Sequence, residues 1–229
     1  MGHRQENDAP GSREAKIGEL GRAYAAAVLA GDEVAAEQVI RDAIAAKLTT
    51  AEIDDEIIAP ALWLVGELWE RGEISVGDEH LATEISIRVL ALQREAQRVA
   101  RARAHHRVML ATPAGEHHVV ALRMVGNLLR AAGYDVVMLG SDVPARALAA
   151  SARRHRPHVI CLSSTMPGGA DHVLVSIHEV QRQWPAAGFV VGGRGLTSRV
   201  RSRPGIDVCR RVSEAVEAVD AMVKRADQN

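Results

Sequence analysis

Aromatic residues are scarce in this sequence, whose 229 residues include one Phe, two Tyr and three Trp. With so few aromatics, the position of each tryptophan is informative, although core packing is the usual explanation for one. Two of them, Trp63 and Trp69, lie close together in the first third of the chain, and Trp184 lies near its end.

Cysteine is also rare, since only Cys161 and Cys209 are present and they form no Cys-x-x-Cys pair. Cys161 lies within the apolar run Val159-Ile160-Cys161-Leu162, which indicates buried thiols in a reducing, cytoplasmic environment. The first dozen residues lack the apolar core of a signal peptide, and no run is long enough to cross a membrane. We therefore expect a cytoplasmic protein with no membrane contact and a disordered N-terminus over residues 1–12.

The chain lacks an excess of charge of either sign, with 28 Lys and Arg against 29 Asp and Glu and a formal net charge of -1. Arginines cluster within residues 98–107 and 194–211, but acidic residues elsewhere balance them. A charge cluster is usually a solvated face, so we do not expect direct binding of nucleic acid.

Residues 13–104 carry apolar side chains at three- and four-residue steps, which predicts helices. Thr49 or Thr50 is expected to cap the third helix, Pro60 to kink it, and the fourth helix to span residues 78–103. Four helices with short connections make a four-helix bundle. The predicted core positions are Ile17, Leu20, Tyr24, Val28, Val34, Val39, Ile40, Ile44, Ile53, Ile57, Pro60 or Ala61, Leu64, Leu81, Ile85, Val89 and Leu92.

One end of this bundle carries a group of polar and aromatic residues. Trp69 lies at the end of the third predicted helix, and nine residues separate it from Glu79-His80 at the start of the fourth. Antiparallel neighbours joined by a short loop bring these ends together. On a purely structural interpretation, Trp69 closes the bundle, Glu79 stabilises a helix N-terminus and His80 is exposed.

From residue 105 to 229, short apolar runs alternate with helical segments, and this predicts a flavodoxin-like (Rossmann-like) doubly wound parallel sheet. The five expected strands are residues 108–111, 135–139, 158–162, 189–191 and 207–209, and residues 140–144 are expected to form a loop. We therefore predict an α/β fold with two domains, a helical bundle over 13–104 and a sheet domain over 105–229.

A pair of imidazoles, His117 and His118, follows the first predicted strand. Loops at the carboxyl edge of a parallel sheet are where open α/β folds bind ligands. Two histidines in a loop are nevertheless more often solvated than functional. Small residues after the third and fourth strands, at Ser163 and Gly192-Gly193, leave space for a ligand chain between the strand ends.

The stretches Glu116-His117-His118-Val119-Val120-Ala121, Leu162-Ser163-Ser164 and Gly192-Gly193 resemble the fingerprint of the cobalamin-binding module of methionine synthase, corrinoid carrier proteins and CarH-type photoreceptors. The resemblance covers the chain from about Tyr24 onward. It implies that His118, not His117, is the lower axial ligand to cobalt and that Glu116 orients its imidazole.

The same resemblance implies that the nucleotide tail of cobalamin lies in a slot lined by Ser163, Gly192 and Gly193. Two positions depart from the commoner family pattern. Glu116 stands where Asp is commoner, as in CarH-type sequences, and Ala121 stands where Gly is commoner. The second departure adds a methyl group near the entrance of the tail.

The spacing of Trp69 and Glu79-His80 is similar to the Trp-x9-Glu-His signature of the light-sensing members of this family. By that similarity, Trp69 would pack over the upper axial group of adenosylcobalamin and Glu79 would hydrogen-bond to it. His80 would then be available to ligate cobalt after light breaks the cobalt–carbon bond.

CarH-type regulators carry an N-terminal helix-turn-helix domain, whereas this chain begins with the bundle, so we expect an indirect output. The leading hypothesis is a non-enzymatic cobalamin light sensor, a homo-oligomer that changes its assembly or its grip on an unknown protein partner. In one variant of this hypothesis, the protein resembles the photocobilins, which pair a cobalamin domain with a bilin such as biliverdin as a second chromophore. The attachment candidates for a bilin are His105, His106, His117 and His172.

Two alternatives stay open. One is a corrinoid protein that carries methyl groups for a separate methyltransferase. The other is a flavodoxin-like binder of some other cofactor, which would leave the polar end of the bundle unexplained.

Overall fold

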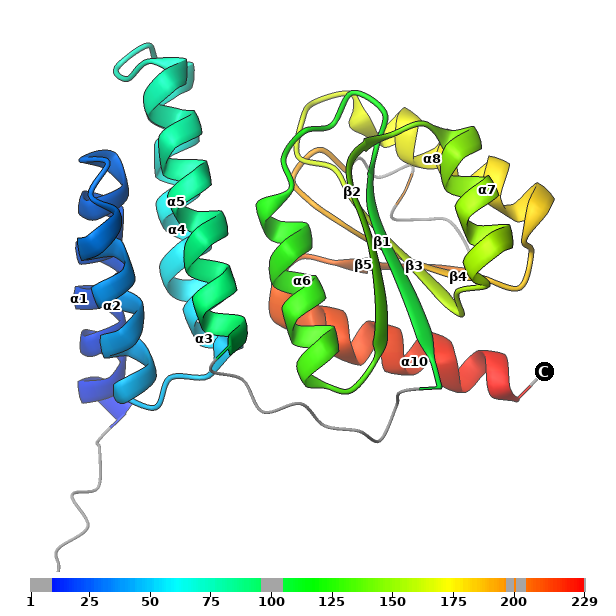
Figure 1. Ribbon diagram of the computed structural model, residues 1–229, viewed down its shortest axis with the longest axis horizontal. Helices are drawn as coiled ribbons and strands as arrows, with labels where there is room; N and C mark the ends of the chain where they lie inside the picture. The colour runs from blue at the N-terminus through cyan, green and yellow to red at the C-terminus, as the bar shows by residue number, and fades with distance from the viewer. Residues whose placement is uncertain (1–9, 96–104, 197–199, 201–204, 229) are drawn as a thin grey trace, which may run out of the picture. The chain divides into compact units, whose positions relative to one another are not determined.

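The computed structural model describes residues 10–95, 105–196, 200 and 205–228 (Figure 1). Contacts within the chain divide it into two units, Met1–Gln93 and Arg94–Asn229. The predicted domain boundary between residues 104 and 105 adjoins the segment 96–104, which lies outside the described residues, and so do residues 1–9 of the predicted disordered start. The other three residues of that start belong to helix α1, which begins at Pro10. A proline at the first helical position fits because its φ is already helical and no intrahelical N–H bond is lost there.

The first unit is helical, as predicted (Figure 1). It contains α1 (Pro10–Leu29), α2 (Glu33–Ala45), α3 (Thr50–Ile53), the π-helical turn η1 (Asp54–Ile58), α4 (Ala59–Glu70) and α5 (Val76–Glu95). Thr49 caps α3 in a capping box with Glu52, which confirms the predicted start. The fourth predicted helix begins two residues earlier than expected, because Ser75 and Asp78 form a second capping box ahead of it.

The predicted kink at Pro60 takes the form of the π-helical turn η1. Pro60 has no N–H to donate to the carbonyl of residue 56, so a regular α-helix would lose a bond there. The chain instead widens in the preceding turn, where the Ala59 N–H donates to the Asp54 carbonyl five residues earlier. α3, η1 and α4 therefore follow one another without a break.

The core of the helical unit differs from the predicted stripes at several positions. Four residues predicted to be inside are exposed: Val34 at 76%, Ile44 at 37%, Leu64 at 38% and Leu81 at 48%. Small residues occupy inner positions instead and let the helices approach closely; they are Ala36, Ala43 and Ala82, while Ala61 is buried as predicted. Large buried side chains that match the prediction are Tyr24, Ile40, Ile53, Ile57, Ile85 and Val89. Helix periodicity located the buried face to within one or two residues, and the distance at which the helices pack decided which of these residues is inside.

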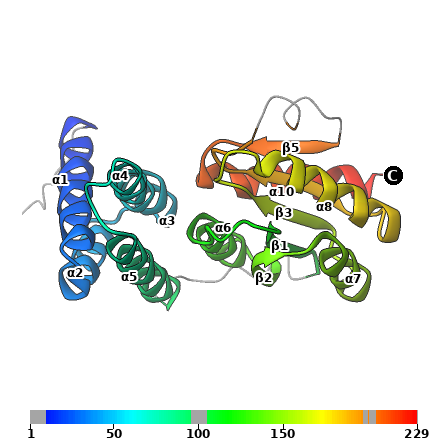
Figure 2. The same cartoon turned by 90° about the horizontal axis from the view of Figure 1, so that it is seen from above.

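The second unit is a five-stranded parallel sheet in the order β2-β1-β3-β4-β5, which confirms the predicted fold class. Its elements are β1 (Arg107–Pro113), α6 (Val120–Ala131), β2 (Asp135–Val143), α7 (Ala145–His155), β3 (Val159–Ser163), α8 (Gly169–Gln183), β4 (Gly188–Gly192), β5 (Ile206–Cys209), η2 (Val212–Glu214) and α10 (Ala215–Asp227). In Figure 2, β2 and β5 form the two edges. No described helix of either unit is long and apolar enough to span a membrane.

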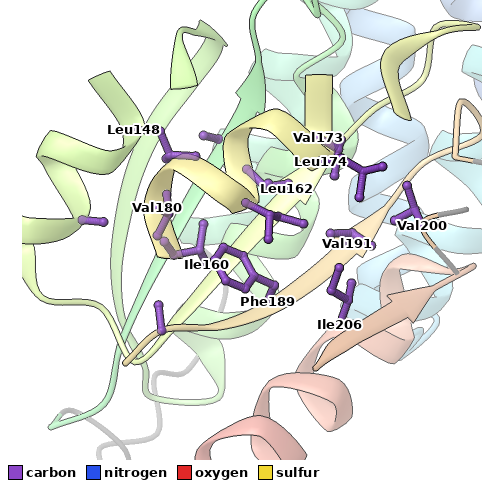
Figure 3. Close-up of a cluster of buried hydrophobic side chains, with 14 of the residues drawn as sticks. Leu148, Ile160, Leu162, Val173, Leu174, Val180, Phe189, Val191, Val200 and Ile206 are labelled. Carbon is purple, nitrogen blue, oxygen red and sulfur yellow. The ribbon is translucent and has the colours of Figure 1, made fainter. Parts of the chain in front are cut away.

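Two apolar layers cover the two faces of the sheet. On one face, strand residues such as Ile160 and Phe189 pack with Leu148 of α7 and Val180 of α8 (Figure 3). On the other face, alternate strand residues pack with α6 and α10; this layer includes Val108, Leu110, Val159, Cys161, Leu122, Leu129, Val219 and Met222. Burial on both faces explains why the strands are continuous apolar runs.

Strand β2 is longer than predicted, since residues 140–143 were expected to form a loop and instead continue the strand. The pairing with β1 shifts register after Leu110, so that Ala111 pairs with Gly140 rather than Leu139. Gly140 has a φ of 91°, which a residue with a side chain rarely adopts. This irregularity carries the strand past the glycine and places Asp142 beside the loop that follows β1.

Candidate functional site

The loop that follows β1 is organised around the carboxylate of Glu116, whose side chain is only 3% exposed. One carboxylate oxygen accepts the His118 backbone N–H at 2.9 Å and contacts His118 Nδ1 at 2.6 Å. The other accepts the backbone N–H groups of Thr165 at 2.6 Å and Met166 at 3.0 Å, both in the loop after β3. One buried side chain therefore joins the loops of two neighbouring strands and orients an imidazole.

The electrostatics of this carboxylate follow from those contacts. Burial alone would raise the pKa of Glu116, but hydrogen bonds from the His118 imidazole and from the N–H groups of Met166, His118 and Thr165 lower it to about 2. Glu116 is therefore an anion, and its carboxylate accepts a hydrogen bond from the Nδ1–H group of His118. A metal ion would then bind to the opposite nitrogen, Nε2, of a ring that is 45% exposed. His117 is exposed, and its ring has no part in this arrangement in the described contacts.

The loops after β3 and β4 lie against each other with glycines at the contacts. The Ser164 N–H donates to the Gly192 carbonyl at 3.0 Å. A Cβ atom on Gly193 would lie 2.0 Å from the Ser164 carbonyl oxygen, and φ at Gly193 is 109°. Gly193 must therefore be glycine, whereas a Cβ on Gly192 would make an ordinary contact at 3.6 Å.

Ser163 is the residue predicted to line the tail slot, and its neighbour Ser164 lies deeper in the structure. Ser163 ends β3 and is 7% exposed, while Ser164 is fully buried. Within the described part of the chain, the Ser164 hydroxyl has no hydrogen-bond partner. A buried hydroxyl usually has a hydrogen-bond partner. The Ser164 Oγ packs against Gly169 at the start of α8, where a Cβ atom would lie 1.9 Å from it.

The predicted residues of the helical unit lie at the turn between α4 and α5 (Figure 1). Trp69 is the penultimate residue of α4 and is 40% exposed. Glu79 lies in the first turn of α5; its carboxylate contacts His80 Nδ1 at 2.6 Å and accepts the Thr83 hydroxyl at 3.0 Å. The His80 side chain is 74% exposed. An exposed indole and a carboxylate–imidazole pair thus lie at one end of this unit.

Several residues that shape the first loop were not singled out from the sequence. Thr112 and Asp142 bond to the loop from β1 and β2, and His172 Nδ1 lies 2.5 Å from the Ala114 carbonyl oxygen. The only signal for Asp142 in the sequence is the Gly-Ser-Asp-Val-Pro stretch at 140–144, which by its composition predicts a loop. The four histidines considered for a bilin do not form one cluster, since His105 and His106 precede β1 while His117 and His172 lie near its other end.

Comparison with known proteins identifies both units. A family profile described as a B12 binding domain matches residues 106–220, half of the chain, and a second profile of the same description matches residues 20–92.

Relatives of two kinds match at similar levels. The chain is 31% identical over 175 residues to the HTH-type transcriptional repressor CarH of Myxococcus xanthus, which covers 76% of this chain and 57% of the repressor. It is 27% identical over 204 residues to trimethylamine corrinoid protein 1 of Methanosarcina mazei, covering 85% of this chain and 90% of that protein. The chain thus spans just over half the length of the repressor.

A solved structure shows the same fold. The monomethylamine corrinoid protein of Methanosarcina barkeri superposes with a TM-score of 0.71 at 18% identity, over 91% of this chain and 99% of that one. The profile that matches residues 106–220, half of the chain, shows that the chain belongs to the B12-binding family.

Proposed function

We propose that the chain binds adenosylcobalamin and acts as a light sensor that signals through its conformation or assembly. The observation that carries this proposal is the exposed group of Trp69, Glu79 and His80 at one end of the helical unit. When bound, adenosylcobalamin supplies a cobalt–carbon bond that visible light can break. In this proposal Trp69 and Glu79 would hold the deoxyadenosyl group, and His80 would be the side chain available to bind cobalt after illumination.

We propose that the α/β unit holds the lower side of the cobalamin. His118 would bind cobalt through Nε2, because Glu116 holds Nδ1. The slot between the β3 and β4 loops would receive the nucleotide tail, with Ser163 and Gly192–Gly193 as its predicted lining.

The relatives favour two outputs. The match to CarH supports light sensing, but the chain covers 57% of that repressor, so we do not transfer its action on transcription. We propose instead that the output is a change of assembly with further copies of the chain or with a protein partner. In neither role do we assign a catalytic residue.

A second candidate function is a corrinoid carrier of methyl groups. The match to trimethylamine corrinoid protein 1, which extends over 90% of that protein, favours it. A carrier must expose cobalt to a methyl donor and has no need of His80 as a light-dependent ligand. The role of His80 therefore separates the two functions.

Illumination of the adenosylcobalamin complex tests the proposal. Free adenosylcobalamin is itself light-sensitive, so the deciding readouts are the particle mass and the spectrum of the protein-bound product after green light. We expect wild type to change mass and to give a product with an imidazole as upper ligand. His80→Ala should bind in the dark as wild type does and give a different product, because the new ligand is missing.

The matched control is His178→Ala, which removes another exposed histidine and should behave as wild type. An unchanged spectrum in light, or the same product and mass change in His80→Ala, would overturn the light-sensor proposal. If the particle mass is unchanged by light and the protein-bound cobalamin gains and loses a methyl group, the carrier function would be favoured. An organic extract of the same preparation tests for a bilin as second chromophore.

A further inference from the structure

The loop of residues 113–118 is held by the Glu116 carboxylate and also by hydrogen bonds to Thr112 and Asp142. The Thr112 hydroxyl, fully buried in β1, donates to the Glu116 carbonyl at 2.5 Å and accepts the Asp142 N–H at 3.1 Å. The Asp142 N–H also lies 3.0 Å from the Glu116 carbonyl. The Asp142 carboxylate accepts the Gly115 N–H at 2.8 Å. Asp142 thus fixes both the N–H of Gly115 and the carbonyl of Glu116.

The backbone at Asp142 is shaped for this contact. Its φ is 54°, in the left-handed region where aspartate, asparagine and glycine are tolerated better than other residues. The register shift at Gly140 brings the end of β2 to this position. Gly115, at φ 79°, is the residue that the carboxylate holds. An otherwise exposed aspartate therefore occupies an uncommon conformation and bonds to the residue before Glu116.

We propose that Asp142 is a positioning residue for the cobalt site: by holding Gly115 it presets the loop on which Glu116 and His118 lie. This inference rests on the proposed role of His118 as the lower ligand. Asp142 does not touch cobalt; it reduces the number of conformations that the loop must give up when His118 binds the metal. Such preorganisation contributes to affinity without adding a contact to the ligand.

Two substitutions separate the carboxylate from the backbone conformation. Asp142→Gly keeps the left-handed φ but removes the acceptor, and Asp142→Asn keeps both, since an amide oxygen can still accept the Gly115 N–H. Hydrogen exchange in the cobalamin-free protein tests the contact itself. We expect the Gly115 amide to exchange about tenfold faster in Asp142→Gly and at the wild-type rate in Asp142→Asn.

The effect on the metal site is tested with cobalamin bound in its cobalt(II) form. Electron paramagnetic resonance shows a splitting from an axial nitrogen, and labelling the protein's histidines with nitrogen-15 changes that splitting only if a histidine is bound. We expect Asp142→Gly to bind cobalamin about tenfold more weakly and to lower the histidine-bound fraction, with Asp142→Asn restoring both. A merely structural role would leave the histidine-bound fraction of the complex unchanged.

His118→Ala provides the reference. If wild type shows no labelled-histidine splitting, the proposed function fails, whatever Asp142 does. If His118→Ala abolishes the splitting while Asp142→Gly matches wild type in affinity and in histidine-bound fraction, the lower-ligand assignment stands and the role of Asp142 is wrong.

Discussion

At the scale of single residues, Glu116 does the most to hold the α/β site together. A buried carboxylate is costly unless its oxygens are satisfied, and here each oxygen accepts two donors. The methylene by which glutamate exceeds aspartate lengthens the reach of the carboxylate, which spans from His118 to the amides of Thr165 and Met166. Glutamate, in place of the commoner aspartate, therefore makes the hydrogen bonds that join the loop after β1 to the loop after β3.

Replacing Glu116 with glutamine should destabilise the cobalamin-free α/β unit by about 2 kcal/mol. An amide NH₂ would face one of the two pairs of N–H donors and leave buried donors unpaired. In a Trp63→Phe, Trp69→Phe background, Trp184 is the remaining tryptophan, and its fluorescence during urea unfolding reports on this unit. Glu217→Gln, on an exposed position of α10, is the control, and equal stability of the two variants would contradict the prediction.

At the scale of elements, the π-helical turn η1 places a carboxyl inside the helical unit. Asp54 is fully buried, and neither of its oxygens has a hydrogen-bond partner among the described residues. Burial raises the pKa of Asp54 to about 7; the nearby Gln93 amide lowers it in part, and the charge of Asp55 raises it further. The turn that accommodates Pro60 therefore contains a carboxyl that is protonated below neutral pH.

The stability of the helical unit should consequently fall as pH rises. The pKa of Asp54 is about 7 in the folded chain against 3.8 in the unfolded chain, so the unfolded state releases the proton first. Between about pH 4 and 7 this group removes about 1.4 kcal/mol of stability per pH unit, and it has no further effect above that window.

Urea unfolding at several pH values measures this slope, with Trp184→Phe as background so that Trp63 and Trp69 report on the helical unit. Asp54→Asn should flatten the dependence, whereas Glu56→Gln, at an exposed position of the same turn, should keep it. A slope that persists in Asp54→Asn would show that another group titrates.

The same elements show what the sequence could predict. The spacing of apolar residues predicted the helices and all five strands. The alignment of residues 116–121 with the family fingerprint singled out Glu116 and His118. The roles of Asp142 and of the exposed Leu64 were missed for physical reasons. A one-residue shift of a helix face depends on how closely small residues let helices approach, and the extension of β2 depends on a register shift that only the paired strand reveals.

At the scale of the whole molecule, the residues proposed to bind cobalamin belong to two separate units. Trp69, Glu79 and His80 belong to the unit Met1–Gln93, and Glu116 and His118 belong to Arg94–Asn229. Sequence order alone predicted that loops after β1, β3 and β4 meet, because parallel strands end at one edge. That the two groups hold one cobalamin stays a prediction.

If one adenosylcobalamin binds to both groups, it must stabilise both units together. At a ligand concentration of about 100 times Kd, a ligand that binds only the folded state adds about 2.7 kcal/mol. In the dark, the unfolding transitions reported by Trp184 alone and by Trp63 with Trp69 should both move to higher urea. Hydroxocobalamin, which lacks the deoxyadenosyl group, should move the helical transition less, and His118→Ala should reduce both shifts. A shift confined to the Trp184 transition would mean that the helical unit takes no part in binding.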